Sequence, residues 1–161
     1  MIARLFRSST VVELSAGDAH LLAAIHRDAF QHNWSADDFV SLLGEATVFA
    51  LGVRRPSLLG RGPLVAFVLV RFAAGEAEIL SIAVRRRDRR RGYGRLLMED
   101  VLRRLYRERI AALFLEVDRA NSAAVGLYRR LGFAVAGERR NYYSAPREGD
   151  GTALVMRLQV R

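Results

Sequence analysis

The decisive stretch of this chain is Ile79–Gly94, which reads ILSIAVRRRDRRRGYG. Its first six residues are apolar apart from Ser81, which is typical of a buried strand, and a basic turn then leads to two glycines. We expect Gly92 and Gly94 to open a helix, because unpaired N–H groups and a partial positive charge at a helix start bind phosphate. Glycine has no Cβ atom, so the backbone there can approach a ligand closely. A strand that ends at a phosphate site predicts a long cofactor with a diphosphate in its middle, such as coenzyme A.

Length and composition limit what the protein can be. The 161 residues predict one domain, 1–161, with a core that needs no disulfide. They contain no cysteine, which excludes thiol nucleophiles and cysteine-zinc sites within them. The histidines at 20, 26 and 32 do not share one helical face, so we expect no metal site. No apolar run is long enough for a membrane span, and the first 15 residues lack the apolar centre of a secretory signal. We therefore expect a cytoplasmic protein that does not act at a membrane.

The charge of the chain is strongly positive. The formal net charge is +9, and all 26 basic residues are arginine. A planar, permanently charged guanidinium group suits phosphate, but a charge of this size permits RNA binding without requiring it. We interpret residues 85–87 as a solvated charge run. Residues 89–95 favour anion binding, since arginines and glycines coincide there with the start of a helix.

Apolar periodicity and turn residues predict the order strand, two helices, three strands, helix, strand, helix and two strands. We expect strands at 10–14, 47–53, 64–72, 76–84, 112–117, 133–140 and 152–160, and helices at 18–31, 35–43, 92–107 and 121–131. Ala74-Gly75 should turn a hairpin, Gly132 should close the last helix, and a polar loop should lie around Pro146. The pattern predicts an α/β protein with a mixed, mostly antiparallel sheet of six to seven strands and about four helices on both faces.

Glu116 is the polar residue that fits its surroundings least. It interrupts the apolar run LFLEV at 113–117, which should be a central strand covered on both faces. Burying a carboxylate costs several kcal/mol unless the group is paired or solvated. We therefore expect either an arginine partner or a place at the floor of a wet cleft. In the second case, partial desolvation would raise the pKa of Glu116 towards that of a general base.

Other polar and aromatic residues allow two interpretations each. Asn121 stands where the last helix begins, so it suits an N-cap as well as a binding role. Tyr128 on the same helix suits core packing, but a hydroxyl of pKa near 10 could also protonate a departing thiolate whose parent pKa is about 8.5. Trp34, Tyr142 and Tyr143 are expected in loops, as apolar plugs or as walls of a substrate site.

Three stretches of the chain together resemble the Gcn5-related N-acetyltransferase (GNAT) superfamily. They are SIAVRRRDRRRGYGRLLME at 81–99, LFLEVDRANSAAVGLYRRLGF at 113–133 and RRNYY at 139–143. Within the superfamily they most resemble the bacterial ribosomal-protein alanine N-acetyltransferases. The resemblance is close from about Glu76 to Tyr143 and weaker before it.

This resemblance implies a GNAT fold and acetyl-CoA as cosubstrate, with no metal. It implies that the pantetheine arm lies along Ile82, Ala83 and Val84 and uses backbone hydrogen bonds. The pyrophosphate would be held, mostly by backbone N–H groups, at Arg90, Arg91, Gly92, Tyr93, Gly94 and Arg95. Asn121 would contact the cofactor near the base of its arm.

The resemblance also implies roles in catalysis. Glu116 would be the general base, directly or through water, with Glu78 as an alternative, and Tyr128 would be the general acid. The acceptor would be a protein N-terminus, with ribosomal-protein N-terminal alanine as the first candidate. At pH 7 an N-terminal amine of pKa about 8 costs only ~1.4 kcal/mol to deprotonate, against ~4.6 kcal/mol for lysine, so one carboxylate base suits it. On the substrate side we expect Trp34, Glu76, Glu78, Tyr142 and Tyr143.

Two other functions compete with this interpretation. One is the same chemistry on a small amine, such as a polyamine or an aminoglycoside, which a deep acidic pocket would favour over an open groove. The other is a non-catalytic module that binds acetyl-CoA or RNA, whose nucleic-acid affinity would fall steeply with salt. We expect a monomer or a weak dimer in either case.

Overall fold

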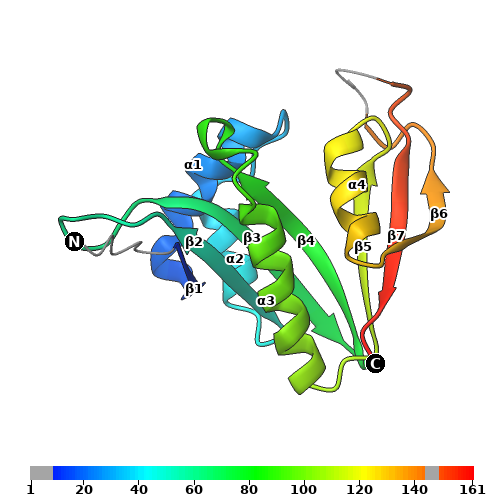
Figure 1. Ribbon diagram of the computed structural model, residues 1–161, viewed down its shortest axis with the longest axis horizontal. Coiled ribbons are helices and arrows are strands. Elements are labelled where there is room, and N and C mark those ends of the chain that lie inside the picture. Colours follow the sequence, from blue (N-terminus) through cyan, green and yellow to red (C-terminus); the bar gives the residue numbers. More distant parts are fainter. Residues whose placement is uncertain (1–8, 144–148) are drawn as a thin grey trace, which may run out of the picture. The chain divides into compact units, whose positions relative to one another are not determined.

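The computed structural model describes residues 9–143 and 149–161. Their strands form one sheet in the order β1-β2-β3-β4-β5-β7-β6 (Figure 1). The strands are β1 (Thr10–Leu14), β2 (Val48–Arg54), β3 (Leu64–Ala73), β4 (Glu76–Val84), β5 (Ala112–Asp118), β6 (Ala134–Arg139) and β7 (Ala153–Gln159). The helices are α1 (Ala19–Ala29), α2 (Ala36–Leu43), α3 (Tyr93–Arg107) and α4 (Ser122–Arg130), with short 3-10 helices η1 (Ala16–Asp18) and η2 (Arg86–Asp88). The predicted α/β class, element order and mixed sheet are confirmed.

The chain divides into two compact units. The first contains the residues up to Val70 together with Ser81–Val101, and the second contains Arg71–Leu80 and Leu102–Arg161. Strands β3 and β4 and helix α3 each contribute residues to both units. The sequence predicted one domain over 1–161, and this stays a prediction.

Most predicted boundaries lie within two residues of the observed ones, because local signals set them. The Ser35 side chain accepts a hydrogen bond from the Asp38 N–H at 3.2 Å, and the Asp38 carboxylate accepts from the Ser35 N–H at 2.7 Å, which is the capping box of α2. Ala74 and Gly75 have φ values of 52° and 80°, as a two-residue hairpin turn requires. Gly132, at φ 101°, ends α4.

Some predictions need correction. The first helix ends at Ala29 rather than at residue 31, because Phe30 has extended backbone angles and packs its ring against His26. The 3-10 helices η1 and η2 were not predicted. The run at 113–117 is not covered equally on both faces, since Phe114 and Glu116 are only partly buried while Leu113, Leu115 and Val117 are buried. The predicted loop around Pro146 lies outside the described residues.

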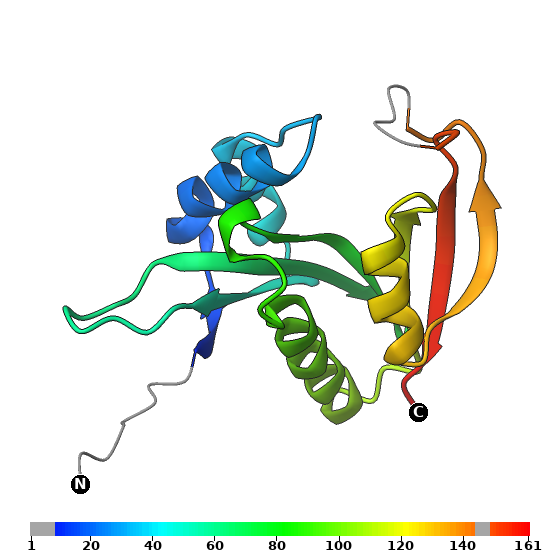
Figure 2. The ribbon, with the colours of Figure 1, turned by 45° about the horizontal axis from the view of Figure 1, so that its top comes forward.

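The core of the first unit is formed by helices on both faces of β2 and β3. Figure 2 shows α1 and α2 on one face of these strands and α3 on the other. The register of β1 and β2 is antiparallel and pairs Leu14 with Ala50. Each of the three helices and strand β3 contributes fully buried side chains to this unit, namely Leu22, Phe39, Phe67, Leu97 and Met98.

The second unit is built on β5, which is paired on both sides. It runs parallel to β4 over Glu76–Glu78 and antiparallel to β7 along its whole length. Strand β6 pairs with the other edge of β7. Helix α4 follows β5 and contributes Val125 and Tyr128 to the buried residues of this unit. Glu116 therefore lies on a strand that has β4 on one side and β7, followed by β6, on the other.

Candidate functional site

The first unit contains the turn that the sequence predicts to bind an anion, and this turn begins with a buried ion-pair cluster. Asp88 is fully buried, and its carboxylate receives hydrogen bonds from Arg85 Nε at 2.8 Å and from Arg55 Nη1 at 3.1 Å. Asp28 of α1 accepts a bond from the Arg86 N–H at 2.7 Å. The interpretation of 85–87 as a solvated run is therefore wrong for Arg85, because Asp88 binds it, while Arg86 and Arg87 are exposed.

The turn that follows has the backbone shape of an anion cradle. Arg90 and Gly92 have φ values of 63° and 83°, in the left-handed region that lets successive N–H groups point to one side. A Cβ atom placed on Gly92 would meet nothing within 4 Å, so the space in front of this backbone is open. The Leu96 N–H donates to the Gly92 carbonyl at 3.0 Å, where α3 begins. An open, left-handed turn at a helix start fits a pyrophosphate.

The other predicted cofactor residues lie on β4 and on the first turn of α3. The β4–β5 ladder covers Glu76–Glu78, so Ile82 and Val84 are outside it, half-buried, with Ala83 buried between them. Tyr93 is half-buried and its hydroxyl accepts a bond from Ser9 at 3.4 Å. Gly94 is half-buried and Arg95 exposed. Backbone groups of β4 beyond the ladder fit an extended pantetheine arm.

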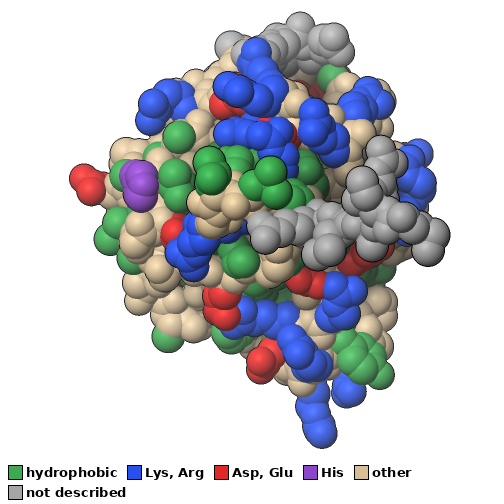
Figure 3. All heavy atoms as spheres, turned by 60° about the vertical axis from the view of Figure 1, so that its left-hand side comes forward, with side chains coloured by type: hydrophobic (Ala, Val, Ile, Leu, Met, Phe, Trp, Pro, Cys, Tyr) green, Lys and Arg blue, Asp and Glu red, His purple; other side chains and the backbone are tan. Residues whose placement is uncertain are grey.

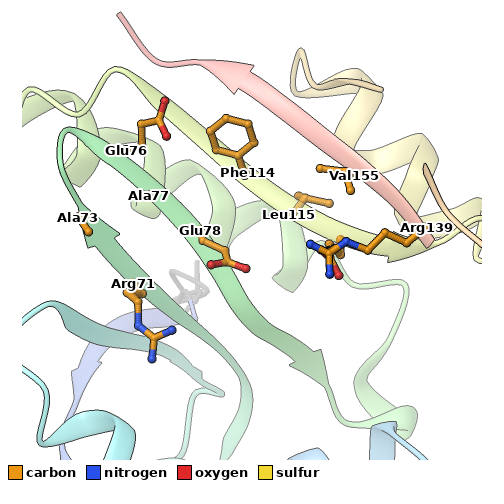
Figure 4. A pocket seen from close by; sticks show the side chains of 10 residues that line it. Arg71, Ala73, Glu76, Ala77, Glu78, Phe114, Leu115, Arg139 and Val155 are labelled. Carbon is orange, nitrogen blue, oxygen red and sulfur yellow. Dashed lines mark ion pairs between the residues drawn. The ribbon is translucent and has the colours of Figure 1, made fainter. Parts of the chain in front are cut away.

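The second unit contains a cavity of about 400 Å³. Figure 4 shows its lining, which comes from β3, β4, β5, β6 and β7. Three carboxylates and two guanidinium groups face it, belonging to Glu76, Glu78, Glu116, Arg71 and Arg139. Phe114, Leu115 and Val155 supply part of its apolar wall. A volume of about 400 Å³ lies within the range of small-ligand sites, and the lining of this one is strongly charged.

Glu116 has a charged partner in this cavity. Arg139 Nε lies 3.0 Å from Glu116 Oε1, and the side chains are 59% and 21% exposed. The guanidinium carbon of Arg139 lies 5.7 Å from the centre of the Tyr142 ring. Burial, the negative charge of Glu116 and a hydrogen bond with it raise the pKa of Tyr142. Both expectations for Glu116, an arginine partner and a place at a cavity, are thus observed together.

Tyr128 lies on α4 and is buried, with an exposure of 5%. Burial, and then the charge of Tyr143, raises the pKa of Tyr128 from 10.0 to about 12. Burial, followed by Asp118, Tyr142 and Glu116, raises the pKa of Tyr143 to about 12 as well. Both hydroxyls therefore stay protonated at neutral pH, so each is a hydrogen-bond donor there.

Asn121 and Trp34 have structural partners. The Asn121 side chain accepts a bond from the Ala124 N–H at 3.2 Å and caps α4, which leaves its NH₂ group as a donor. Trp34 stacks on His26 at 5.1 Å in a cluster of rings of the first unit, and its backbone N–H donates to His26 Nδ1 at 3.3 Å. Burial lowers the pKa of His26, so this ring is neutral at pH 7.

Arginine side chains dominate the charge of the surface. Figure 3 shows a face on which they are spread widely, with fewer carboxylates among them. Within the described ranges 9–143 and 149–161, no three metal-ligating side chains are grouped so that they could hold an ion. No helix in the same ranges has the length and apolar character needed to cross a bilayer.

Sequence reasoning missed Asp88, Arg55 and Arg139 as members of these sites. Asp88 carried a signal, since it is the one acid among seven arginines of the turn. Arg139 carried none that a strand pattern could reveal. Its place depends on a β-bulge between Val135 and Gly137, which changes the register of β6.

A turn that fits a pyrophosphate and a carboxylate-lined cavity are each expected of an acyltransferase with a phosphorylated donor. Residues 19–133 match the model of the Acetyltransferase (GNAT) family, which is more than half of the chain. The protein belongs to the GNAT acetyltransferase family, and acetyl-CoA is the acetyl donor of this family.

Similar proteins narrow the class further. The chain is 33% identical over 152 residues to the [Ribosomal protein bS18]-alanine N-acetyltransferase of Escherichia coli K12, covering 94% of this chain and 98% of that one. The crystal structure of the ribosomal-protein-S18-alanine N-acetyltransferase from Escherichia coli has a TM-score of 0.85 at 32% identity, with 95% and 94% coverage. Ard1 from Thermoplasma volcanium has a TM-score of 0.82 at 25% identity, with 95% and 98% coverage. The protein is an N-acetyltransferase by this evidence.

Proposed function

We propose that the protein acetylates the N-terminal α-amine of a protein, with the N-terminal alanine of a ribosomal protein as its first candidate acceptor. The observation that carries this proposal is the 33% identity to the bS18-alanine enzyme, which extends over 94% of the chain. A cavity lined by three carboxylates supports a cationic acceptor, although the whole chain has a net charge of +9. Ribosomal proteins are made in the cytoplasm, so we expect the enzyme there.

Acetyl-CoA would be held by backbone groups of the first unit. The open turn from Arg90 to Gly92 suits the pyrophosphate, with Arg91, Tyr93, Gly94 and Arg95 beside it in sequence. Ile82, Ala83 and Val84 would lie along the pantetheine arm. From the second unit, Asn121 would contribute its NH₂ group as a donor near the base of that arm. When bound, the cofactor supplies an activated acetyl thioester.

Glu116 would receive the proton that the acceptor must lose before it can attack. An N-terminal amine arrives as an ammonium group, and the Glu116 carboxylate takes one proton from it, directly or through water. The neutral nitrogen then attacks the thioester carbonyl, and the carbon–sulfur bond breaks. Glu78 lines the same cavity and is the alternative base.

Tyr128 would supply a proton to the sulfur. Its pKa of about 12 keeps it protonated, but complete transfer to a thiolate with parent pKa near 8.5 is uphill by roughly 5 kcal/mol. We therefore propose that Tyr128 donates a hydrogen bond to the sulfur as the bond breaks. The Tyr128 proton moves to the sulfur only as Tyr128 receives the second proton from the attacking nitrogen. The overall reaction then releases one proton, which Glu116 passes to water.

Thiol release from acetyl-CoA tests the proposal with two peptides at equal concentration. One has a free N-terminal alanine, and the other has the same sequence with a blocked N-terminus and one internal lysine. We expect turnover of the first at least about tenfold above the second, with the acetyl group placed on the α-amine by mass spectrometry. Preference for lysine would contradict the proposal. Turnover of spermidine but of neither peptide would favour a small amine.

A further inference from the structure

The carboxylate of Glu116, which is proposed as the base, already has interaction partners in the structure. Arg139 Nε lies 3.0 Å from Glu116 Oε1, and the hydroxyl of Tyr142 shares a hydrogen bond with the same carboxylate. The guanidinium group of Arg139 therefore competes with any incoming ammonium group for the Glu116 carboxylate. The ion pair must therefore open, or share its carboxylate, before Glu116 can meet an acceptor.

The strand register explains why Arg139 reaches Glu116 from two strands away. Glu116 of β5 pairs with Val155 of β7, and Val155 pairs in turn with Gly137 of β6. Arg139 is two residues beyond Gly137 on β6, so it lies on the same face of the sheet as this row. The bulge between Val135 and Gly137 sets that register, and a shift of one residue would place Arg139 on the other face.

The pair is also built to open easily. Arg139 is 59% exposed, so its guanidinium group can return to water without a large desolvation cost. The Tyr142 ring lies 5.7 Å from the guanidinium carbon and can keep the arginine close after it leaves the carboxylate. Exposed ion pairs are weak, which suits an interaction that a substrate must replace.

We propose that Arg139 holds the Glu116 carboxylate while no acceptor is bound, and that the acceptor ammonium group takes its place. Arg139 is a positioning residue in this scheme, since it acts through Glu116. The inference rests on the proposed function in one respect, namely that Glu116 receives the acceptor. It adds that the cavity selects primary ammonium groups, which can replace a guanidinium ion, over neutral or acidic ligands.

Several other ionisable groups line the cavity or interact with Glu116 or its neighbouring tyrosines. Arg71, Glu76 and Glu78 line the cavity with Glu116, Tyr142 and Tyr143 interact with Glu116, and Asp118 interacts with Tyr143. Removing Arg139 takes away one positive neighbour and leaves these groups in place.

The test compares Arg139→Gln with Arg140→Gln, a matched variant at the next position, which is exposed. In Arg139→Gln we expect the KM for the alanine peptide to fall about two- to fivefold, with kcat changed less than twofold. Arg140→Gln should leave the KM unchanged, and Arg139→Lys should restore part of the KM, since it keeps the charge. An unchanged or raised KM in Arg139→Gln would overturn the proposal.

Peptide binding separates failure of this proposal from failure of the proposed function. Calorimetric titration of the alanine peptide into the enzyme saturated with coenzyme A measures Kd without turnover. Arg139→Gln should tighten Kd in the natural background but not in a Glu116→Gln background, because the two residues act as a pair. Equal tightening in both backgrounds would show that Arg139 acts elsewhere. Full turnover by Glu116→Gln would instead refute the base assignment alone.

Discussion

Asp88 and Glu116 are both carboxylates held by arginine, but the two regions differ in access to water. Asp88 is fully buried and receives Arg85 and Arg55, whose side chains are 24% and 35% exposed. Glu116 is 21% exposed and pairs with one arginine, Arg139, which is 59% exposed. A buried carboxylate cannot lose its partners without a large cost, whereas an accessible one can exchange them. A carboxylate paired with arginine therefore stabilises a turn in the first unit, whereas in the second unit it can exchange its arginine for another cation.

The largest expected effect comes from removing the charge at the accessible position. Glu116→Gln keeps the size of the side chain but cannot accept the acceptor's proton, so we expect kcat to fall at least ~100-fold, about 2.7 kcal/mol in barrier. The KM for acetyl-CoA should change less than about twofold. Steady-state kinetics with the alanine peptide measures both constants.

Glu78→Gln is the variant that decides between the two candidate bases, because Glu78 lines the same cavity. Its loss of kcat should be much smaller than that of Glu116→Gln. A larger loss of kcat in Glu78→Gln than in Glu116→Gln would show that Glu78 is the base. The exchange of cations at Glu116 would then have no role in catalysis.

The second effect concerns the buried carboxylate and appears in stability. Asp88→Asn leaves Arg85 and Arg55 without a counter-charge, so we expect the free energy of unfolding to fall by about 2 kcal/mol. This is less than for a fully buried pair, because both arginines reach water. Urea unfolding measures the change. Glu138→Gln is the control, since Glu138 is 42% exposed and pairs with Arg119 at 3.4 Å. Equal losses in both variants would contradict the comparison.

The third effect concerns a buried neutral group of the second unit, the Tyr128 hydroxyl. Burial raises the pKa of Tyr128 from 10.0 to about 12 in the folded protein, while the unfolded chain keeps the ordinary value. Between pH 10 and 12 the unfolded chain loses a proton that the folded protein retains. The stabilisation is thus complete below pH 10 and is lost as the pH rises towards 12. At pH 11 the loss from Tyr128 is about 1.4 kcal/mol.

Urea unfolding of the natural protein and of Tyr128→Phe at pH 9, 10 and 11 isolates this loss. Tyr142 and Tyr143 also have raised pKa values and are present in both proteins, so their contributions largely cancel in the difference, apart from the coupling of Tyr143 to Tyr128. The unfolding free energy of Tyr128→Phe should fall less steeply with pH. Parallel curves would mean that the Tyr128 hydroxyl is not desolvated in solution.

The limits of sequence reasoning follow from what each feature depends on. The capping box at Ser35 and the hairpin turn at Ala74 were predictable, because neighbouring residues determine them. Asp88 meets Arg55 across 33 positions, and no local pattern predicts that contact. Arg139 meets Glu116 because β7 lies between β5 and β6 and because β6 contains a bulge. The sequence predicted both Glu116 and a cavity around it. Identifying Arg139 as the partner of Glu116 required the register of β6 in the structure.

The smallest effect is expected for an ion pair in which both side chains are exposed. Arg95 and Glu99 are 58% and 40% exposed and meet at 2.9 Å one turn apart on α3. The arginine precedes the glutamate, which is the weaker orientation on a helix. Glu99→Gln should therefore change the free energy of unfolding by less than ~0.5 kcal/mol in urea. Because Arg95 lies in the proposed pyrophosphate site, losing the competing carboxylate should lower the KM for acetyl-CoA by up to about twofold. A stability loss as large as that of Asp88→Asn would show that burial does not rank these pairs.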